Sequence, residues 1–295
     1  MSKQIEKEGA AAASGPKGMY RQFWQQFKKN KLALAALFLL VVIHLVVFLG
    51  PLFYTVSPEA IDPLNALQPP SAQHPLGTDE TGRDTLARLL HGGRISLIVG
   101  TFSMVISILV GTLVGAMAGY YGGVVDMVLM RLTDALMSVP SLFLLLIILT
   151  IFQGGIVTIV LVLGLTSWMG VSRIVRGEML RWKAEDFVEA ERSLGAKNFR
   201  IIFKHILPNA FASIIVAASL GIAKAILSES SLSYLGLGIQ PPTPSLGNML
   251  MNSQIYVWNA PIQAVWPGVL ILLIVICYNS LGDGLRVALD PRMKQ

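Results

Sequence analysis

The amino-acid sequence predicts an all-α polytopic membrane protein with about six transmembrane helices and with both termini in the cytoplasm. Composition is the first observation behind this prediction: 54% of the 295 residues are hydrophobic and 14% are charged, against about 25% charged residues in a soluble domain. The second observation is that the charges cluster between long uncharged stretches. The mean hydropathy of +0.63 agrees with this class. The same composition excludes a disordered chain and a nucleic-acid-binding tail. A disulfide scaffold is excluded because the single cysteine, Cys277, has no partner within the chain.

Six stretches are long enough to cross a bilayer, because about 20 apolar residues in a helix span its hydrocarbon core. The predicted spans are 32–54, the stretch between Arg94 and Asp126, a third that ends near Ile151, a fourth that begins near Ile156, Pro208–Leu227 and Ala264–Leu281. The Gln-Gly-Gly sequence at 153–155 is a turn signal that separates the third span from the fourth. Prolines make the segment 240–262 unfit for a straight helix, so a loop and a re-entrant helix are both open there.

Basic residues decide the orientation, since cytoplasmic segments carry an excess of Lys and Arg. Seven precede or begin the first span, eight lie between Arg173 and Lys204, and three follow Asp283. These three segments fall on the same side of a six-span chain, which we therefore predict to be the cytoplasm.

The segment before the first span carries its own helical pattern. Tyr20, Phe23, Trp24 and Phe27 recur at helical spacing among basic residues. This predicts an amphipathic helix that either lies on the cytoplasmic leaflet or extends the first span.

Residues with chemical reactivity do not form a recognisable active site. No lysine is followed by Ser or Thr, which excludes the usual nucleotide-binding P-loop, and the four histidines lack zinc-site spacing. Asp79, Glu80 and Asp84 form an acidic cluster that could hold a divalent cation, but loop acids that cap a helix starting near Thr85 are the commoner arrangement. We therefore predict no catalytic residue and no metal site.

Charges near or within the membrane call for partners, because they usually face a cavity or each other. Asp134 is three residues from Arg131, so we expect these two to pair on one helix face. Lys224 and Glu229 lie near the end of the fifth span. In the second span, glycines at 111, 115 and 119 predict close approach of another helix.

The cytoplasmic segment from Arg173 to Lys204 has the pattern of a short amphipathic helix, a turn at Gly195 and a second short helix. The apolar stripe consists of Phe187, Val188, Ala190, Leu194 and Ile201. Such an element suits docking into a groove on a soluble partner. A solvated helical hairpin is the alternative that composition leaves open.

Part of this segment resembles the EAA loop of permease subunits in binding-protein-dependent ABC importers. It reads Glu189-Ala190-Glu191-Arg-Ser-Leu-Gly195, followed by His205-Ile-Leu-Pro208. Glu191 stands where that motif has a second alanine, and His205 where an aliphatic residue is usual. Three other stretches resemble the C-type permease of dipeptide and oligopeptide importers, and they are His74–Asp84 with Arg94–Leu97, Glu229–Ser245, and Leu281–Arg286 with Leu289–Arg292.

The resemblance implies the type I ABC importer permease fold in a bacterial-type plasma (inner) membrane. It implies a heterodimer with a sister permease, two ATPase subunits that bind ATP and Mg²⁺, and an extracellular or periplasmic solute-binding protein. No cofactor is then held by this chain itself. The residues implied in ATPase coupling are Glu189, Ala190, Gly195, Leu207 and Pro208, and Arg83 is implied as a possible binding-protein contact.

The expected organisation follows from the spans and the resemblance together. It comprises a cytoplasmic N-terminal segment with an amphipathic helix (1–31), a first transmembrane helix (32–54), an external loop (55–94), a permease core (95–286) with a cytoplasmic coupling loop (184–205), and a cytoplasmic tail (287–295). The cargo stays open among dipeptides, oligopeptides, nickel chelates, glutathione and oligosaccharides. An ion- or proton-coupled secondary transporter is the alternative function, but the central parts of spans two, four and six lack the charged residues that it needs.

Overall fold

A computed structural model describes residues 16–152 and 155–289, and most of these residues are helical. The helices are α2 (Pro16–Lys29), α3 (Lys31–Phe53), α4 (Thr85–Tyr121), α5 (Gly123–Met137), α6 (Ser141–Ile151), α7 (Ile156–Lys183), α8 (Asp186–Ser193), α9 (Asn198–Arg200), α10 (Leu207–Tyr234), α11 (Leu246–Ser253) and α12 (Ile262–Leu289). A π-helical turn at Ile201–Ile206 joins α9 to α10. The described ranges contain no strand, in agreement with the predicted all-α class.

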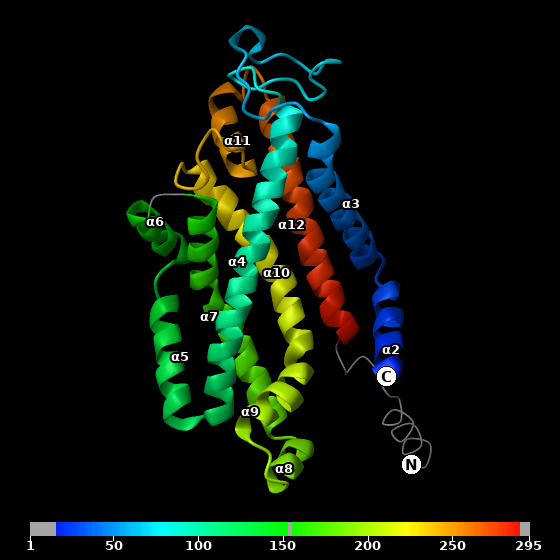
Figure 1. Cartoon of the computed structure of the whole chain (residues 1–295), viewed down its shortest axis with the longest axis vertical. Helices are drawn as coiled ribbons and strands as arrows, with labels where there is room; N and C mark the ends of the chain where they lie inside the picture. The colour runs from blue at the N-terminus through cyan, green and yellow to red at the C-terminus, as the bar shows by residue number, and fades with distance from the viewer. Residues whose placement is uncertain (1–15, 153–154, 290–295) are drawn as a thin grey trace.

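Five of the described helical segments are long and apolar enough to cross a membrane: α3, α4, α7, the run 198–234 that ends with α10, and α12. The third predicted span is a bent pair, because α5 and α6 meet at 83°. Pro140 directly precedes α6, and a proline disfavours helical geometry in the residue before it. The third predicted span thus consists of two helices joined at a sharp bend, which make a sixth span when they are counted as one. The pair still carries the chain from the lower end of α4 to the upper end of α7 (Figure 1).

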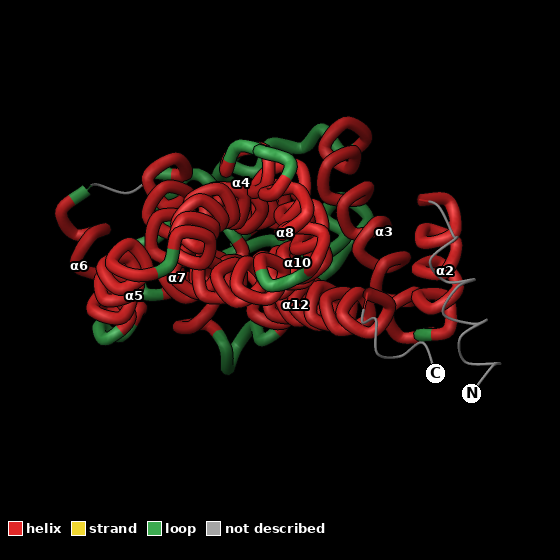
Figure 2. Tube along the Cα trace, turned by 90° about the horizontal axis from the view of Figure 1, so that it is seen from below, coloured by secondary structure: helices red, strands yellow, loops and turns green. Residues whose placement is uncertain are grey.

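The two ends of the bundle carry different structures. The loop between α3 and α4 and the short helix α11 lie at the upper end, whereas α8, α2 and the last turn of α12 lie at the lower end (Figure 1). Seen from below, α4, α7, α10 and α12 form the centre, with α5 and α6 on one side and α2 and α3 on the other (Figure 2). Residues 1–15, most of the turn predicted at 153–155, and 290–295 of the predicted tail lie outside the described residues.

Helix α2 is separate from the first span. It ends at Lys29, and the side chain of Asn30 caps α3 by accepting a hydrogen bond from the backbone N–H of Ala33 (3.1 Å). The alternative of one continuous helix is therefore wrong. Phe27 is buried, and its ring lies near Gly284 of α12. This contact attaches α2 to the lower end of the last span.

The close helix packing that the glycines predict is confirmed between α4 and α7. A Cβ atom at Gly111 would lie 2.6 Å from the Cβ of Val171, and one at Gly119 would lie 2.5 Å from the Cβ of Met179. No side chain fits at those distances. The three glycines bring the two helices close enough to act as one unit in the centre of the bundle.

The proline-rich region after α10 contains a short helix and no further span. Helix α11 has eight residues, or about 12 Å of rise, and packs against α10 and α12 at the upper end. Ser245 and Asn248 form a reciprocal capping box at its start. The region therefore caps the upper end of the bundle and is too short to cross a bilayer.

Candidate functional site

The candidate site is the segment 184–205, predicted to be a cytoplasmic coupling loop, and it is held against the bundle by one buried side. Val188 of α8 is 1% exposed and lies in a cluster with Val175 and Met179 of α7 and with Ile201. The apolar stripe expected from the sequence is therefore divided between two faces. Its buried members anchor α8, and the others face outward.

Gly195 ends α8 with a left-handed backbone, at φ +79°. Such a conformation favours glycine because it places a Cβ too close to the following carbonyl oxygen. The N–H groups of Gly195 and Ala196 donate to the carbonyls of Arg192 and Glu191 and close the helix end. A Cβ at Gly195 would meet no atom within 4 Å, so this turn is open to a partner. The predicted turn at Gly195 is confirmed.

The outward face of this loop is apolar as well as charged. Glu189 and Ala190 are exposed, Leu194 is 84% exposed and Phe199 is 70% exposed. The rings of Phe199 and Phe203 lie 4.4 Å apart and both face out. Clustered apolar side chains at the end of a helical bundle are typical of a protein interaction surface.

The second short helix expected after Gly195 is part of a longer helical arm. From Asn198 the chain runs through the π-helical turn directly into α10, with the Leu207 N–H donating to the Ile202 carbonyl five residues back. Leu207 is half-buried, and Pro208 is exposed as the second residue of α10. The π turn accommodates a proline without an N–H inside this arm. The segment 198–206 is thus joined to α10 without a loop between them.

Acidic residues of α5 pair with α7 and not within α5 itself. Arg176 donates two hydrogen bonds of 2.5 Å to the carboxylate of Asp126. Arg173 donates one of 2.5 Å to Asp134. The expected pairing of Asp134 with Arg131 is therefore wrong, because α7 packs beside α5 and offers better-placed arginines.

The two charges of α10 have opposite environments. Glu229 is fully buried, and its carboxylate accepts hydrogen bonds of 2.7 Å from the hydroxyls of Ser96 on α4 and Ser233. Lys224 is exposed and makes no hydrogen bond or ion pair within the described residues. Glu229 thus ties α10 to α4, while Lys224 is free to interact outside the chain.

A groove opens beside the coupling loop, between α7, α10 and α12. Its volume is about 390 Å³. It is lined by Ile174, Glu178, Arg181, Trp182, Asn209, Ala212, Ser213, Val216, Ala217, Leu220, Arg286 and Leu289. The Glu178 carboxylate accepts hydrogen bonds from Ser213 (2.7 Å) and from the Trp182 ring N–H (3.0 Å), so the wall nearest α7 is held rigidly.

At the upper end, the acidic cluster of Asp79, Glu80 and Asp84 organises the loop between α3 and α4. The Asp84 carboxylate caps α4 by accepting from the Ala87 N–H (2.8 Å), as expected for loop acids. The same carboxylate accepts a hydrogen bond of 2.8 Å from the Tyr54 hydroxyl. Burial, with that hydrogen bond and the charge of Asp84 adding to it, raises the pKa of Tyr54 to about 12.

Arg83 is buried in this loop, with 6% of its surface exposed. Its guanidinium donates to Asp79 at 2.7 Å and to Glu80 at 2.9 Å. The side chain is thus occupied within the loop, and any role of Arg83 at an interface is to hold the loop in shape. Among the described residues no group of three or more His, Cys, Asp or Glu side chains could hold a metal ion.

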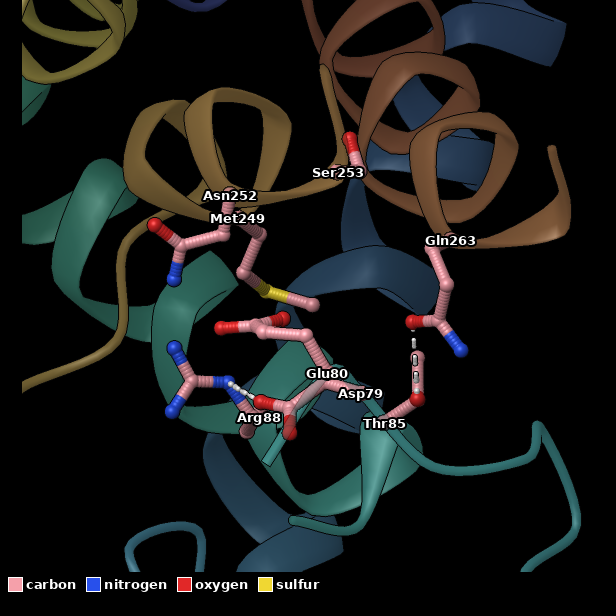
Figure 3. A pocket seen from close by; sticks show the side chains of 8 residues that line it. All are labelled: Asp79, Glu80, Thr85, Arg88, Met249, Asn252, Ser253 and Gln263. Carbon is pink, nitrogen blue, oxygen red and sulfur yellow. Dashed lines mark hydrogen bonds and ion pairs between the residues drawn. The ribbon is translucent and has the colours of Figure 1, made fainter. Parts of the chain in front are cut away.

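A small cavity lies beneath this loop. Figure 3 shows the Arg88 guanidinium beside Asp79, across from Asn252 and Met249 of α11. The Arg88 Nε lies 3.3 Å from Asp79, and its Nη2 has no hydrogen-bond partner. The cavity measures about 10 Å³, the size of one water molecule. It joins the loop to α11 and is too small for a cargo.

Comparison with known families matches nearly the whole chain. Residues 111–295 match a family model described as the binding-protein-dependent transport system inner membrane component. Residues 18–70 match the N-terminal transmembrane domain of oligopeptide transport permease C.

The matches to curated relatives cover most of this chain and most of each relative. The chain is 40% identical over 275 residues to the dipeptide transport system permease protein DppC of Alkalihalophilus pseudofirmus, which covers 93% of this chain and 90% of the relative. It is 37% identical over 277 residues to the oligopeptide transport system permease protein OppC of Bacillus subtilis, and this match covers 94% of this chain and 91% of the relative. It is 39% identical over 276 residues to the glutathione transport system permease protein GsiD of Pectobacterium atrosepticum, and this match covers 93% of this chain and 92% of the relative.

Among solved structures, the fold is similar to a chain of the MetNI methionine ABC transporter in inward-facing conformations. The TM-score is 0.55 with 19% identity, and the match covers 68% of this chain and 95% of the other. At that identity the likeness concerns the fold alone, and the matched fold is that of an ABC importer permease.

Proposed function

Because the chain belongs to the family of binding-protein-dependent transport system inner membrane components, we propose that it imports dipeptides or oligopeptides as one of two permease subunits in an ATP-driven complex. The observation that carries the proposal is the helical arm from the coupling loop into α10. This arm joins an exposed docking surface to a membrane-spanning helix, as an ATP-driven pathway requires.

The coupling loop is the proposed contact with an ATPase subunit. Ala190 and Gly195 are small and exposed and would fit a closely shaped groove, and Glu189 would make a polar contact at its rim. Leu194 and Phe199 would supply the apolar area that anchors such an interface. Closure of two ATPases would then push the arm and tilt α10, with Leu207 and Pro208 at the point where the arm enters the span.

The upper end is the proposed contact with an external solute-binding protein. Leu64 in the loop and Trp258 after α11 are each 92% exposed. Large apolar side chains of this kind are favoured at the centres of protein interfaces. Arg83 supports this surface by holding Asp79 and Glu80 in place.

Peptides are the proposed cargo because the dipeptide and oligopeptide relatives match the chain over almost its full length. Glutathione, the cargo in the name of a third relative, is itself a small peptide. The function as a permease subunit is favoured over ion-coupled secondary transport by family membership. The exposed faces of α7, α10 and α12 around the groove are where we propose that the sister permease completes the pathway.

The proposal is tested by reconstitution. The chain is expressed with its sister permease, the two ATPases and the solute-binding protein, and the purified complex is placed in proteoliposomes. We expect uptake of a labelled dipeptide or oligopeptide that requires both ATP and the binding protein, with no ATP hydrolysis by this chain alone. Uptake driven by a proton or sodium gradient without ATP would contradict the proposal.

The orientation is tested separately with single cysteines. In a Cys277→Ser background, Leu64→Cys should react with an impermeant maleimide in intact spheroplasts. Leu194→Cys, which is similarly exposed at the opposite end, should react only after lysis. The reverse result would place the coupling loop outside and overturn the assignment of the cytoplasmic face.

A further inference from the structure

One face of α10 is left uncovered by the rest of the chain. Ser213, Ala217, Leu220, Lys224, Leu227 and Ser231 follow one another at intervals of three and four residues, which puts them on the same side of the helix. Lys224 and Ser231 are exposed, and Leu227 is 44% exposed. This stripe is called the open face of α10 below.

The opposite side of α10 is fixed against the bundle. Ile226 is fully buried, next to Gly100 of α4, and Glu229 is bonded to Ser96. Ser219 is buried near Gly282 of α12, and Leu220, at the edge of the open face, packs against the same glycine. Helix α10 therefore cannot rotate to bury Lys224 without breaking these contacts, so the open face is a fixed feature of the fold.

Lys224 lies deep within this span. Ten residues separate it from Tyr234 at the upper end of α10, a rise of about 15 Å. A lysine near the end of a helix can reach the interface with its long side chain, but at this depth it lies in the hydrocarbon region if it faces lipid. Charged groups at such positions face water or an oppositely charged group. The open face is therefore not a lipid-facing surface.

The open face is continuous with the groove at the cytoplasmic end. Ser213, Ala217 and Leu220 line that groove, and Lys224 follows Leu220 by one helical turn. The groove opens between α7, α10 and α12, and its lining includes Glu178 and Arg181. A groove that carries charged side chains in its lining and leads to a lysine in mid-span has the character of one wall of an aqueous passage.

From this arrangement we propose that Lys224 lines the translocation pathway and binds the carboxylate of the passing cargo. The proposal rests on the proposed function and deepens it by naming the chemical group recognised. The neighbours of Lys224 on the open face are Leu220 and Leu227, which carry no charge. A single ammonium between apolar residues attracts the terminal carboxylate that peptides share, whatever their side chains. It thus favours free-acid peptides without selecting a sequence.

The test compares one peptide in two forms, as the free acid and as the C-terminal amide. Each form is added at a concentration that saturates the solute-binding protein, as measured by direct titration of the binding protein with that form. Maximal uptake is measured for the wild type, Lys224→Met, Lys224→Arg and the control Leu45→Met, which changes an exposed residue of α3 away from the open face.

We expect Lys224→Met to lower uptake of the free acid about tenfold or more, since a hydrogen-bonded charge pair is lost, and to leave uptake of the amide unchanged. Lys224→Arg should retain the preference for the free acid, and Leu45→Met should behave as the wild type. Equal loss of both peptide forms in Lys224→Met, or no loss of either, would overturn the proposal. So would failure of Lys224→Met to co-purify with the sister permease, because the lysine would then belong to a subunit contact.

The same experiment distinguishes failure of the proposed function from failure of the proposed role of Lys224. A wild-type complex that imports neither peptide with ATP contradicts the function itself. A wild-type complex that imports both forms at equal rates, and whose rates are unchanged in Lys224→Met, contradicts the role of Lys224 alone.

Discussion

The carboxylate of Glu191 and the imidazole of His205 lie 3.5 Å apart, between Oε1 and Nε2. These are the two positions at which the coupling loop differs from the Glu-Ala-Ala pattern and its aliphatic-x-Leu-Pro ending. The structure brings both differences to the same place, across the turn at Gly195. Their spacing suits an ion pair when the imidazole is protonated, and Nε2 is buried without a hydrogen bond. The two departures are therefore neighbours in the folded chain, although they lie 14 residues apart in sequence.

We expect this pair to behave non-additively in a double-mutant cycle. Glu191→Ala or His205→Val alone leaves one polar group in the turn without its partner, whereas the double variant restores the family pattern. ATPase retention during purification should fall in each single variant and recover in the double variant, with a coupling of about 0.5–3 kcal/mol. Additive losses would show that the two side chains act independently.

The arginines of α7 that bind α5 should differ in their contribution to stability. Arg176 makes two hydrogen bonds to Asp126, and both side chains are partly buried. Arg173 and Asp134 are about half exposed, and such a pair contributes about 0–1 kcal/mol. We expect Arg176→Met to cost about 1–3 kcal/mol and to lower the thermal unfolding temperature of the purified chain more than Arg173→Met does. Equal effects would mean that burial does not distinguish the pairs.

Gly195→Arg should release the ATPases without affecting membrane insertion. It adds a charge at the proposed contact, and an unpaired charge buried there costs several kcal/mol, which lowers ATPase occupancy by orders of magnitude. The amount of ATPase that co-purifies with the permease pair measures this occupancy.

Two variants control the Gly195 experiment. Gly155→Arg adds the same side chain in open space at ordinary backbone geometry (φ −176°) and should retain the ATPases. Gly195→Asn tolerates the left-handed turn and separates backbone strain from docking. If Gly195→Arg purifies with a full complement of ATPase, the loop does not dock there.

Alanine substitutions at two glycines should change the stability of the protein in opposite directions. In Gly115→Ala the new Cβ lies 2.8 Å from the Cβ of Val175, so α4 and α7 must separate at a cost of about 1–3 kcal/mol. Gly170→Ala meets no atom within 4 Å and should stabilise α7 by up to about 1 kcal/mol through reduced backbone freedom. Thermal unfolding of the two purified variants checks this, and a stable Gly115→Ala would show that the helices are less closely packed.

The Tyr54–Asp84 hydrogen bond should stabilise the external loop up to alkaline pH. The pKa of Tyr54 is about 12 in the folded protein, above the usual value of about 10 in an unfolded chain. Its contribution is therefore fully present below pH 10 and is lost as the pH rises from 10 to 12. Tyr54→Phe should lower the unfolding temperature at pH 8, and the difference from wild type should shrink at pH 11. A difference that grows with pH would contradict this assignment.

The bilayer class, five of the predicted spans and the turn at Gly195 were determined by the sequence itself. Each depends on local properties: the length of an uncharged run against the thickness of a bilayer, and the backbone freedom of one glycine. The glycines of α4 likewise predicted close packing, because a missing side chain has the same consequence whichever helix approaches. The cap of α4 by Asp84 is local for the same reason.

Only the tertiary structure decided which charges meet and which remain free. Asp134 pairs with Arg173 and not with Arg131, because helix packing brings α7 alongside α5. The 83° bend between α5 and α6, the burial of Glu229 among serines and the exposure of Lys224 also depend on how whole helices pack and rotate. A sequence fixes the order of residues around a helix, but the free energy of packing against its neighbours decides which side of that helix faces inward.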